Sequence, residues 1–234
     1  LGCHSGWWEE MAPHLTGSFY LVAPDFRGHG DSPRADSYRF TDYTADLSDL
    51  VANMGNPNYV IAGHSMGGYV GLVMAATTPY KPRALVVIDM KTEASPEELA
   101  QMAAVSQKPA RTFASLDDAL GRYRLAPPEH VVPAETLTRV ARDSYRQLPD
   151  GAWTEKFDRR AMAIEPLDPT GLARQAGCPM HFIRGEHSLV MAEAPARELA
   201  ESAGAPLTTL TGCYHHLPLE APARLAALLK EQLA

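Results

Sequence analysis

Short apolar, β-prone runs recur along this chain, and most are followed by a segment with helical periodicity. These runs predict strands at residues 19–23, 59–62, 84–88, 180–183 and 207–211. In the first half of the chain they do not alternate between apolar and polar residues, which is typical of strands covered on both faces. The pattern predicts an α/β fold with a mostly parallel sheet and helices on both faces.

The segments between these runs have the apolar periodicity of helices. The clearest is 41–54, where one face carries Tyr43, Leu47, Leu50, Val51 and Met54. Thr41 is suited to cap its start, and Gly55 is suited to end it in the left-handed region. Further helices are expected at 66–77, at 193–203 and from Pro222 onward.

The alternation of strands and helices stops at Lys91 and resumes after Gly177. The residues between them contain helical pieces separated by prolines, and none of their runs indicates a buried strand. We therefore expect an α/β core formed by residues 1–90 and 179–234, interrupted by a helical insertion at 91–178.

Composition excludes several classes of protein. The 234 residues are 45% hydrophobic and 21% charged, with a formal net charge of −7 at pH 7. This is the composition of an ordinary globular protein, and the mild negative charge argues against a nucleic-acid partner. No apolar stretch approaches the roughly 18 residues of a membrane span.

The cysteines and histidines show no pattern of a metal site. Cys3, Cys178 and Cys213 are far apart and form no C-x-x-C, so a reducing cytoplasm is expected. The nine histidines lack metal-binding spacing, and no predicted strand leads into G-x-G-x-x-G, so we expect neither a metal nor a dinucleotide cofactor. The chain opens at Leu1 with no basic segment ahead of an apolar one, so no signal peptide is expected.

A G-x-S-x-G motif occupies residues 63–67, directly between the predicted strand 59–62 and the predicted helix 66–77. A turn straight from strand to helix would push the Ser65 hydroxyl out beyond the sheet edge, and the flanking glycines leave room for it. A glycine-rich turn that only packs closely is the alternative. The strand–helix context favours a nucleophilic serine.

A nucleophilic serine needs a general base. His215 has the best surroundings of the nine histidines, because it follows the predicted strand 207–211 and a short turn and precedes the last helix. Its neighbour His216 is an alternative, and both could simply hold a loop together.

Together these segments resemble the α/β-hydrolase superfamily over nearly the whole chain outside the insertion. Residues 25–32 (DFRGHGDS) are similar to its D-x-R-G-x-G-x-S loop, 63–67 to its nucleophile elbow, and 212–222 to its G-x-G-H-x-x-x-x-E-x-P ending. The last match implies that the base is His215, five residues before Glu220, rather than His216. The resemblance also implies that the insertion folds as a helical cap over the serine.

Residues 2–8 resemble the family's H-G loop, with Leu1 in place of the His. The resemblance implies that the backbone N–H groups of Cys3 and Met66 form an oxyanion hole, with no role for the Cys3 thiol. It also implies that the family's first strands would lie before Leu1, so that the chain either lacks them or builds a smaller sheet.

The family most often places the acid of the triad after its seventh strand, where this chain has Glu186, Ser188 and Leu189 but no Asp. Some members carry the acid after the sixth strand instead, and Asp89 ends the predicted strand 84–88. We therefore expect Asp89, with Glu186 as the alternative. Either carboxylate would orient and stabilise the imidazole of His215.

Aromatic side chains are the candidates for the substrate pocket, namely Trp7, Phe113, Tyr123 and Trp153. Eleven Lys/Arg against twelve Asp/Glu at 91–165 indicate a balanced surface rather than an anion site. The sequence thus predicts a cytoplasmic serine hydrolase without cofactor, cleaving small-molecule esters of small to medium acyl chain through an acyl-enzyme. Thioester, lactone or carbon–carbon hydrolysis on the same triad, and a non-catalytic ligand-binding protein, are the alternatives, and the oligomeric state stays open.

Overall fold

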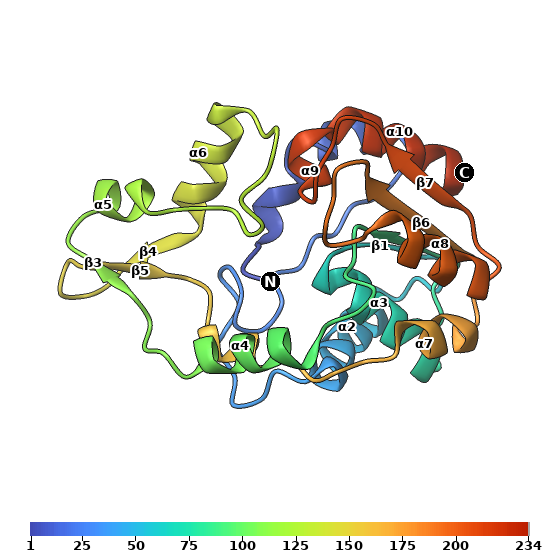
Figure 1. The fold of residues 1–234 in the computed structure, drawn as a ribbon, viewed down its shortest axis with the longest axis horizontal. Coiled ribbons are helices and arrows are strands. Elements are labelled where there is room, and N and C mark those ends of the chain that lie inside the picture. The colour runs from blue at the N-terminus through green and yellow to red at the C-terminus, as the bar shows by residue number, and fades with distance from the viewer. Residues whose placement is uncertain (234) are drawn as a thin grey trace.

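A computed structural model describes residues 1–233, and its centre is a parallel sheet (Figure 1). Four strands lie in the order β1 (Val60–His64), β2 (Ala84–Ile88), β6 (Met180–Gly185) and β7 (Leu207–Leu210), each parallel to its neighbours. Four of the five predicted strands are therefore confirmed. Within the described residues this sheet has four strands.

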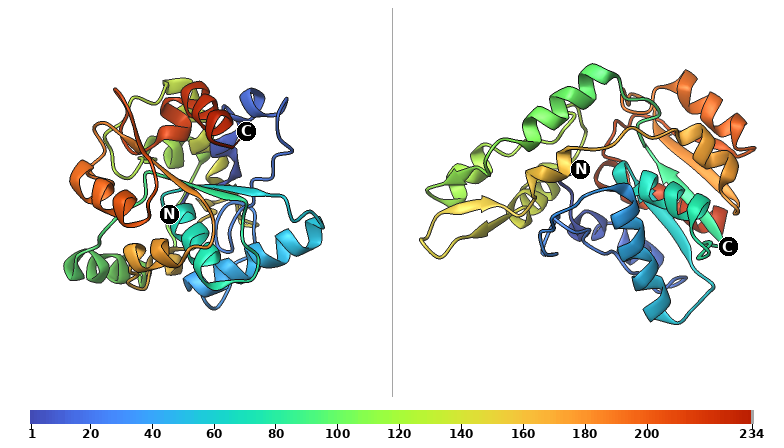
Figure 2. Two further views of the ribbon diagram at one scale, coloured as in Figure 1. Left: turned by 90° about the vertical axis from the view of Figure 1, so that its right-hand side faces the viewer. Right: turned by 90° about the horizontal axis from the view of Figure 1, so that it is seen from below.

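Helices cover both faces of this sheet, as predicted (Figure 2). Because successive side chains of a strand point to opposite faces, Val86 and Ile88 of β2 pack on one side, and Leu85 and Val87 on the other. The first side is covered by α1 (Ala12–Leu15), α9 (Leu217–Glu220) and α10 (Pro222–Leu233). The second is covered by α3 (Met66–Thr77), α7 (Pro169–Gln175) and α8 (Glu193–Ser202), with α2 (Phe40–Met54) packed on α3.

The predicted helices at 41–54, 66–77 and 193–203 and from Pro222 are confirmed as α2, α3, α8 and α10. The capping of α2 differs from the prediction: the helix begins at Phe40, and the Asp42 carboxylate accepts the Arg39 N–H at 2.9 Å, so Thr41 is not the cap. Gly55 ends the helix at φ 65°, as expected.

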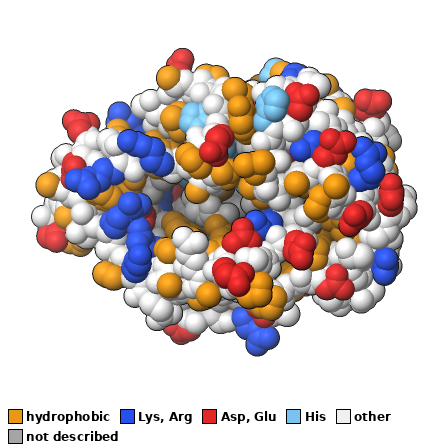
Figure 3. Space-filling view, in the orientation of Figure 1, with side chains coloured by type: hydrophobic (Ala, Val, Ile, Leu, Met, Phe, Trp, Pro, Cys, Tyr) orange, Lys and Arg blue, Asp and Glu red, His pale blue; other side chains and the backbone are white. Residues whose placement is uncertain are grey.

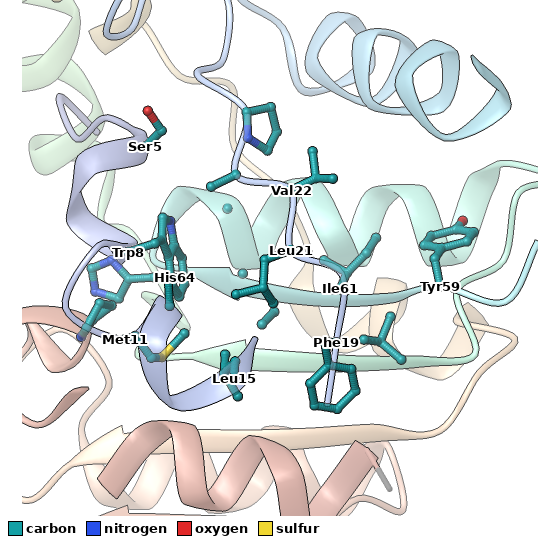
Figure 4. Close-up of a pocket in the computed structure, with 18 of the residues that line it drawn as sticks. Ser5, Trp8, Met11, Leu15, Phe19, Leu21, Val22, Tyr59, Ile61 and His64 are labelled. Carbon is teal, nitrogen blue, oxygen red and sulfur yellow. The ribbon is translucent and has the colours of Figure 1, made fainter. Parts of the chain in front are cut away.

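The prediction of a strand at 19–23 is wrong. The segment is not part of either sheet, and the Tyr20 side chain is 90% exposed. A strand needs a neighbour that supplies hydrogen bonds, and the described residues provide none here. Instead, a cavity of about 930 Å³ is lined by this segment and by β1, with Leu21 and Ile61 among its apolar walls (Figure 4).

Residues 91–178 contain the expected helical pieces, which are α4 (Pro96–Ser106), α5 (Leu116–Gly121), α6 (Ala134–Asp143) and η2 (Arg159–Met162), followed by α7. They also contain an antiparallel sheet with the order β3 (Thr112–Phe113), β5 (Trp153–Glu155), β4 (Tyr145–Gln147). No run in the sequence indicated a buried strand here, and strands of two or three residues are too short to show a period. This sheet forms a lobe with α5 and α6 beside the core (Figures 1 and 2).

Candidate active site

Ser65 stands at the junction of β1 and α3 in a strained backbone conformation, with φ 52° and ψ −119°. Gly63 makes this turn possible, since a Cβ there would lie 2.3 Å from the carbonyl oxygen of Gly67. Gly67 itself has open space at its Cβ position. Met66 is the first residue of α3, so its N–H has no acceptor within the helix. The turn therefore presents a serine next to a free backbone donor.

Asp89 and His215 come from different parts of the chain and meet in the protein interior. Asp89 directly follows β2 at a φ of 43°, the other non-glycine residue besides Ser65 with positive φ in the described chain. The Nδ1–H of His215 donates to Asp89 Oδ1 at 2.8 Å. The exposed fraction is 0% for Asp89 and 5% for His215. The structure thus joins the predicted base to the predicted acid.

Two further donors hold the Asp89 carboxylate. The Ser188 hydroxyl donates to Oδ1 at 2.6 Å, and the Gly185 N–H donates to Oδ2 at 2.7 Å. Glu186, the alternative acid, accepts the Gly212 N–H at 2.8 Å instead and lies on the surface. The structure therefore brings Asp89, and not Glu186, to the imidazole of His215.

Burial controls the electrostatics of this pair. Loss of hydration raises the pKa of Asp89 to about 7, while the hydrogen bonds from Ser188 and Gly185 act in the opposite direction. Burial, followed by the charge of neighbouring His216, lowers the pKa of His215 to about 3. The imidazole is therefore neutral at neutral pH. With its Nδ1–H donated to Asp89, its Nε2 is free to accept a proton.

His216 is committed to a different contact. Its Nε2–H donates to the carbonyl oxygen of Pro127 at 2.8 Å, and its side chain is buried. His64, next to the serine, donates its Nε2–H to the carbonyl oxygen of His215 at 2.8 Å, and Trp7 stacks on it at 6.1 Å between ring centroids. These contacts fix the loop that carries His215.

The two predicted oxyanion donors lie on one cavity. Cys3 and Met66 both line the space of about 930 Å³ beside β1, but Ser65 and His215 are not among the residues that line it. Cys3 precedes η1 (Ser5–Trp8), and this turn is held by the Ser5 N–H, which donates to the Asp25 carboxylate at 2.6 Å. Figure 4 shows Ser5 and His64 around this cavity. Burial raises the pKa of the Cys3 thiol, which keeps it protonated.

The predicted pocket residues occupy two different places. Trp7 and Tyr123 pack in one cluster with Cys3, where the lobe meets η1. Phe113 and Trp153 face each other across β3 and β5 in the interior of the lobe, next to Tyr145. The structure thus groups Trp7 with Cys3 but does not bring Phe113 and Trp153 there, and Tyr123 packs against both clusters. Figure 3 shows a hollow between the lobe and the core.

Ser188 was missed as a site residue in the sequence analysis. Its side chain is buried and contacts the acid directly, yet nothing in the residue type marks it. The available signal was its position, because it stands in the loop where the family resemblance placed a carboxylate.

Two kinds of site have no support among residues 1–233. No group of three or more His, Cys, Asp or Glu side chains is placed there to hold a metal ion. Within the same range, no helix combines the length and the apolar character required to cross a membrane.

Known proteins resemble this chain throughout its length. A family model described as "Alpha/beta hydrolase family" matches residues 1–228. Lipase LipV of Mycobacterium tuberculosis is 28% identical over 161 residues, which are 69% of this chain and 54% of the lipase. This chain thus spans about half the length of that curated relative.

Solved structures share the fold. An E-2-(acetamidomethylene)succinate hydrolase has a TM-score of 0.83 at 22% identity, covering 99% of this chain and 87% of its own. An esterase from Mycobacterium tuberculosis has a TM-score of 0.78 at 20% identity, covering 99% and 80%. At these identities the likeness shows the fold alone.

Proposed function

The chain belongs to the alpha/beta hydrolase family, and from this premise we propose that it is a serine hydrolase cleaving carboxylic esters of small to medium acyl chain. One observation carries the proposal. The buried Asp89 carboxylate accepts the Nδ1–H of His215 at 2.8 Å, in a core whose elbow holds Ser65 at a strained, positive φ. A neutral imidazole with a free Nε2 is the base that a serine nucleophile requires.

In this mechanism the Ser65 hydroxyl attacks the acyl carbon of the ester while His215 Nε2 takes its proton. The oxygen of the tetrahedral intermediate becomes negative, and the N–H groups of Cys3 and Met66 donate to it. Collapse breaks the bond to the alcohol, which leaves with the proton from His215. Water, deprotonated by the same imidazole, then cleaves the acyl-enzyme and regenerates Ser65. Asp89 stabilises the imidazolium that forms in both steps.

The relatives support the chemical class, because LipV is named a lipase and a structural neighbour an esterase. The three free cysteines support a reducing, cytoplasmic setting. The cluster of Trp7 and Tyr123 beside Cys3 supports an apolar acyl group next to the oxyanion donors.

The test is hydrolysis of p-nitrophenyl esters from acetate to octanoate by the wild type and by Ser65→Ala. Ser202→Ala, at the end of α8, is the matched control, because its hydroxyl only donates to the carbonyl of Leu199. We expect turnover that disappears in Ser65→Ala and persists in Ser202→Ala. Unchanged turnover in Ser65→Ala would exclude the serine mechanism.

Failure of the wild type on every ester would reject the ester class, and two measurements then separate the alternatives. Acyl thioesters, lactones and β-diketones test other bonds on the same triad. A fluorophosphonate probe tests for an activated serine, since it labels Ser65 only when the hydroxyl is a competent nucleophile. No labelling would favour a ligand-binding protein.

A further inference from the structure

Asp89 Oδ1 receives two hydrogen bonds, one from the imidazole of His215 at 2.8 Å and one from the Ser188 hydroxyl at 2.6 Å. The mechanism accounts for the first bond but not for the second. Ser188 lies in the loop between β6 and α8 and is 4% exposed. A buried hydroxyl on a third segment of the chain therefore shares the carboxylate oxygen that faces the base.

The local backbone directs the proton of this hydroxyl. Ser188 Oγ accepts the N–H groups of Val190 at 3.2 Å and Met191 at 3.3 Å. A hydroxyl has two lone pairs and one proton. With both lone pairs used by the loop, the single proton has one acceptor left, which is the carboxylate of Asp89. The loop thus presents an oriented donor to the acid.

We propose that Ser188 is a positioning residue of this active site, one that holds Asp89 ionised and aimed at His215. The inference rests on the proposed function only in so far as His215 acts as the base. A donor to a carboxylate stabilises its charged form, and Asp89 needs this because it has no contact with solvent. Its other fixed donor is a single backbone N–H, that of Gly185.

Several other groups act on the charge of Asp89. Arg184 on β6 is a cation, and the imidazoles of His215 and His216 become cations when they bind a proton, whereas the Glu220 carboxyl and the Cys213 thiol face Asp89 as acids. These groups remain when the Ser188 hydroxyl is removed. A change in the pH dependence of the Ser188→Ala variant therefore reports the hydroxyl alone.

The experiment compares Ser188→Ala, Ser188→Thr and Ser37→Ala with the wild type. Ser37 is the matched control, because its hydroxyl also donates to a carboxylate, that of Asp42 at the start of α2. We expect kcat of Ser188→Ala for p-nitrophenyl esters to fall about 10- to 100-fold, the effect of one hydrogen bond to a charged group. KM should stay within about twofold, since Ser188 makes no contact with the ester in the proposed mechanism.

The pH profile separates positioning from a structural role. Without the Ser188 hydroxyl the pKa of Asp89 rises, so the acidic limb of kcat/KM should move to higher pH by about one unit. Ser188→Thr keeps the hydroxyl, so it should retain most of the wild-type rate, and the acidic limb of its kcat/KM profile should lie at the wild-type pH. A Ser188→Ala enzyme with an unmoved limb overturns the proposal, whatever its rate.

A readout independent of turnover separates this proposal from the proposed function. The Nδ1–H of His215 gives an NMR signal whose position and titration report its bond to Asp89. We expect this titration to shift in Ser188→Ala and to stay unchanged in Ser37→Ala, even if no ester is hydrolysed. An unshifted titration in a folded Ser188→Ala protein overturns the proposal. If Ser188→Ala does not fold, Ser188→Thr is measured instead. This variant keeps the hydroxyl, so the His215 Nδ1–H must titrate as in the wild type, and a shifted titration overturns the proposal.

Discussion

Replacing Asp89 by Asn removes a negative charge from beside His215 and leaves the size of the side chain almost unchanged. When the imidazole takes the proton of Ser65, a positive charge forms 2.8 Å from Asp89 Oδ1. At an effective dielectric constant of about 20, two unit charges at this separation attract each other by about 6 kcal/mol. This corresponds to about 10⁴ in rate. Because the asparagine amide retains part of the interaction as a dipole, we expect kcat to fall by about 10³ to 10⁴.

The assay is p-nitrophenyl ester hydrolysis at pH 8, above the pKa of about 7 that burial gives Asp89. Glu186→Gln is the matched control, because it makes the same chemical change on the alternative acid. That carboxylate accepts one backbone N–H at the surface, so kcat should stay within about twofold. Thermal unfolding of both variants checks that each is folded.

The reasoning is refuted if Asp89→Asn keeps its rate within about tenfold of the wild type. If kcat falls only in Glu186→Gln, then Glu186 is the acid of the triad. The β6–α8 loop would then have to rearrange during turnover. A large loss in both variants would mean that neither carboxylate acts alone.

Three further predictions follow from the geometry. Gly63→Ala should lower the free energy of unfolding by more than about 2 kcal/mol in urea titration, because its Cβ would lie 2.3 Å from the oxygen of Gly67. The free energy of unfolding of the wild type should fall between pH 6.5 and 4, and His29→Asn should make this fall smaller. Burial lowers the His29 pKa to about 4 and the unfolded state binds the proton first, so the wild type loses about 3 kcal/mol as pH falls through this window. Combining Asp89→Asn with Ser188→Asp should raise kcat at least about tenfold over Asp89→Asn alone, because the Ser188 hydroxyl contacts the same Asp89 Oδ1 that accepts the imidazole N–H, so a carboxylate on residue 188 starts next to that position.

Controls for these variants come from the same chain. Gly17→Ala places a Cβ where nothing lies within 4 Å, so its unfolding in urea should match the wild type. If Gly17→Ala lowers the free energy of unfolding as much as Gly63→Ala, the steric explanation for Gly63 is refuted. For His29, a pH dependence of stability that is identical in His29→Asn and the wild type would refute the assigned pKa. For the double variant, a rate no higher than that of Asp89→Asn would contradict the shared geometry.

The parallel core was predictable from the sequence, because the strands of the core are buried on both faces and its helices carry strong periodicity. The strand at 84–88 and the helix at 66–77 have the predicted bounds. The prediction failed where the tertiary neighbour decides the structure. Residues 19–23 have strand-like composition, yet a strand exists only when another strand supplies its hydrogen bonds. The short strands of the lobe form for the converse reason, since each finds a partner.

The candidate site was predictable where a motif carries it. The spacing around Ser65 and the position of His215 pointed to residues that the structure places on the elbow and beside the acid. The choice between Asp89 and Glu186 needed the fold, because it depends on which loop approaches the imidazole. The role proposed for Ser188 depends on a contact between residues 99 positions apart, which no local pattern reports.

The edge of β1 has a consequence for handling the protein. β1 pairs with β2 on one side, and within residues 1–233 no strand pairs with its other side. A free strand edge is a template onto which a second extended chain can add, and natural edges are protected by charges, prolines or bulges. The sequence Val60–His64 has no Lys, Asp, Glu or Pro, and it borders an apolar cavity. Preparations of this polypeptide should therefore aggregate as concentration rises.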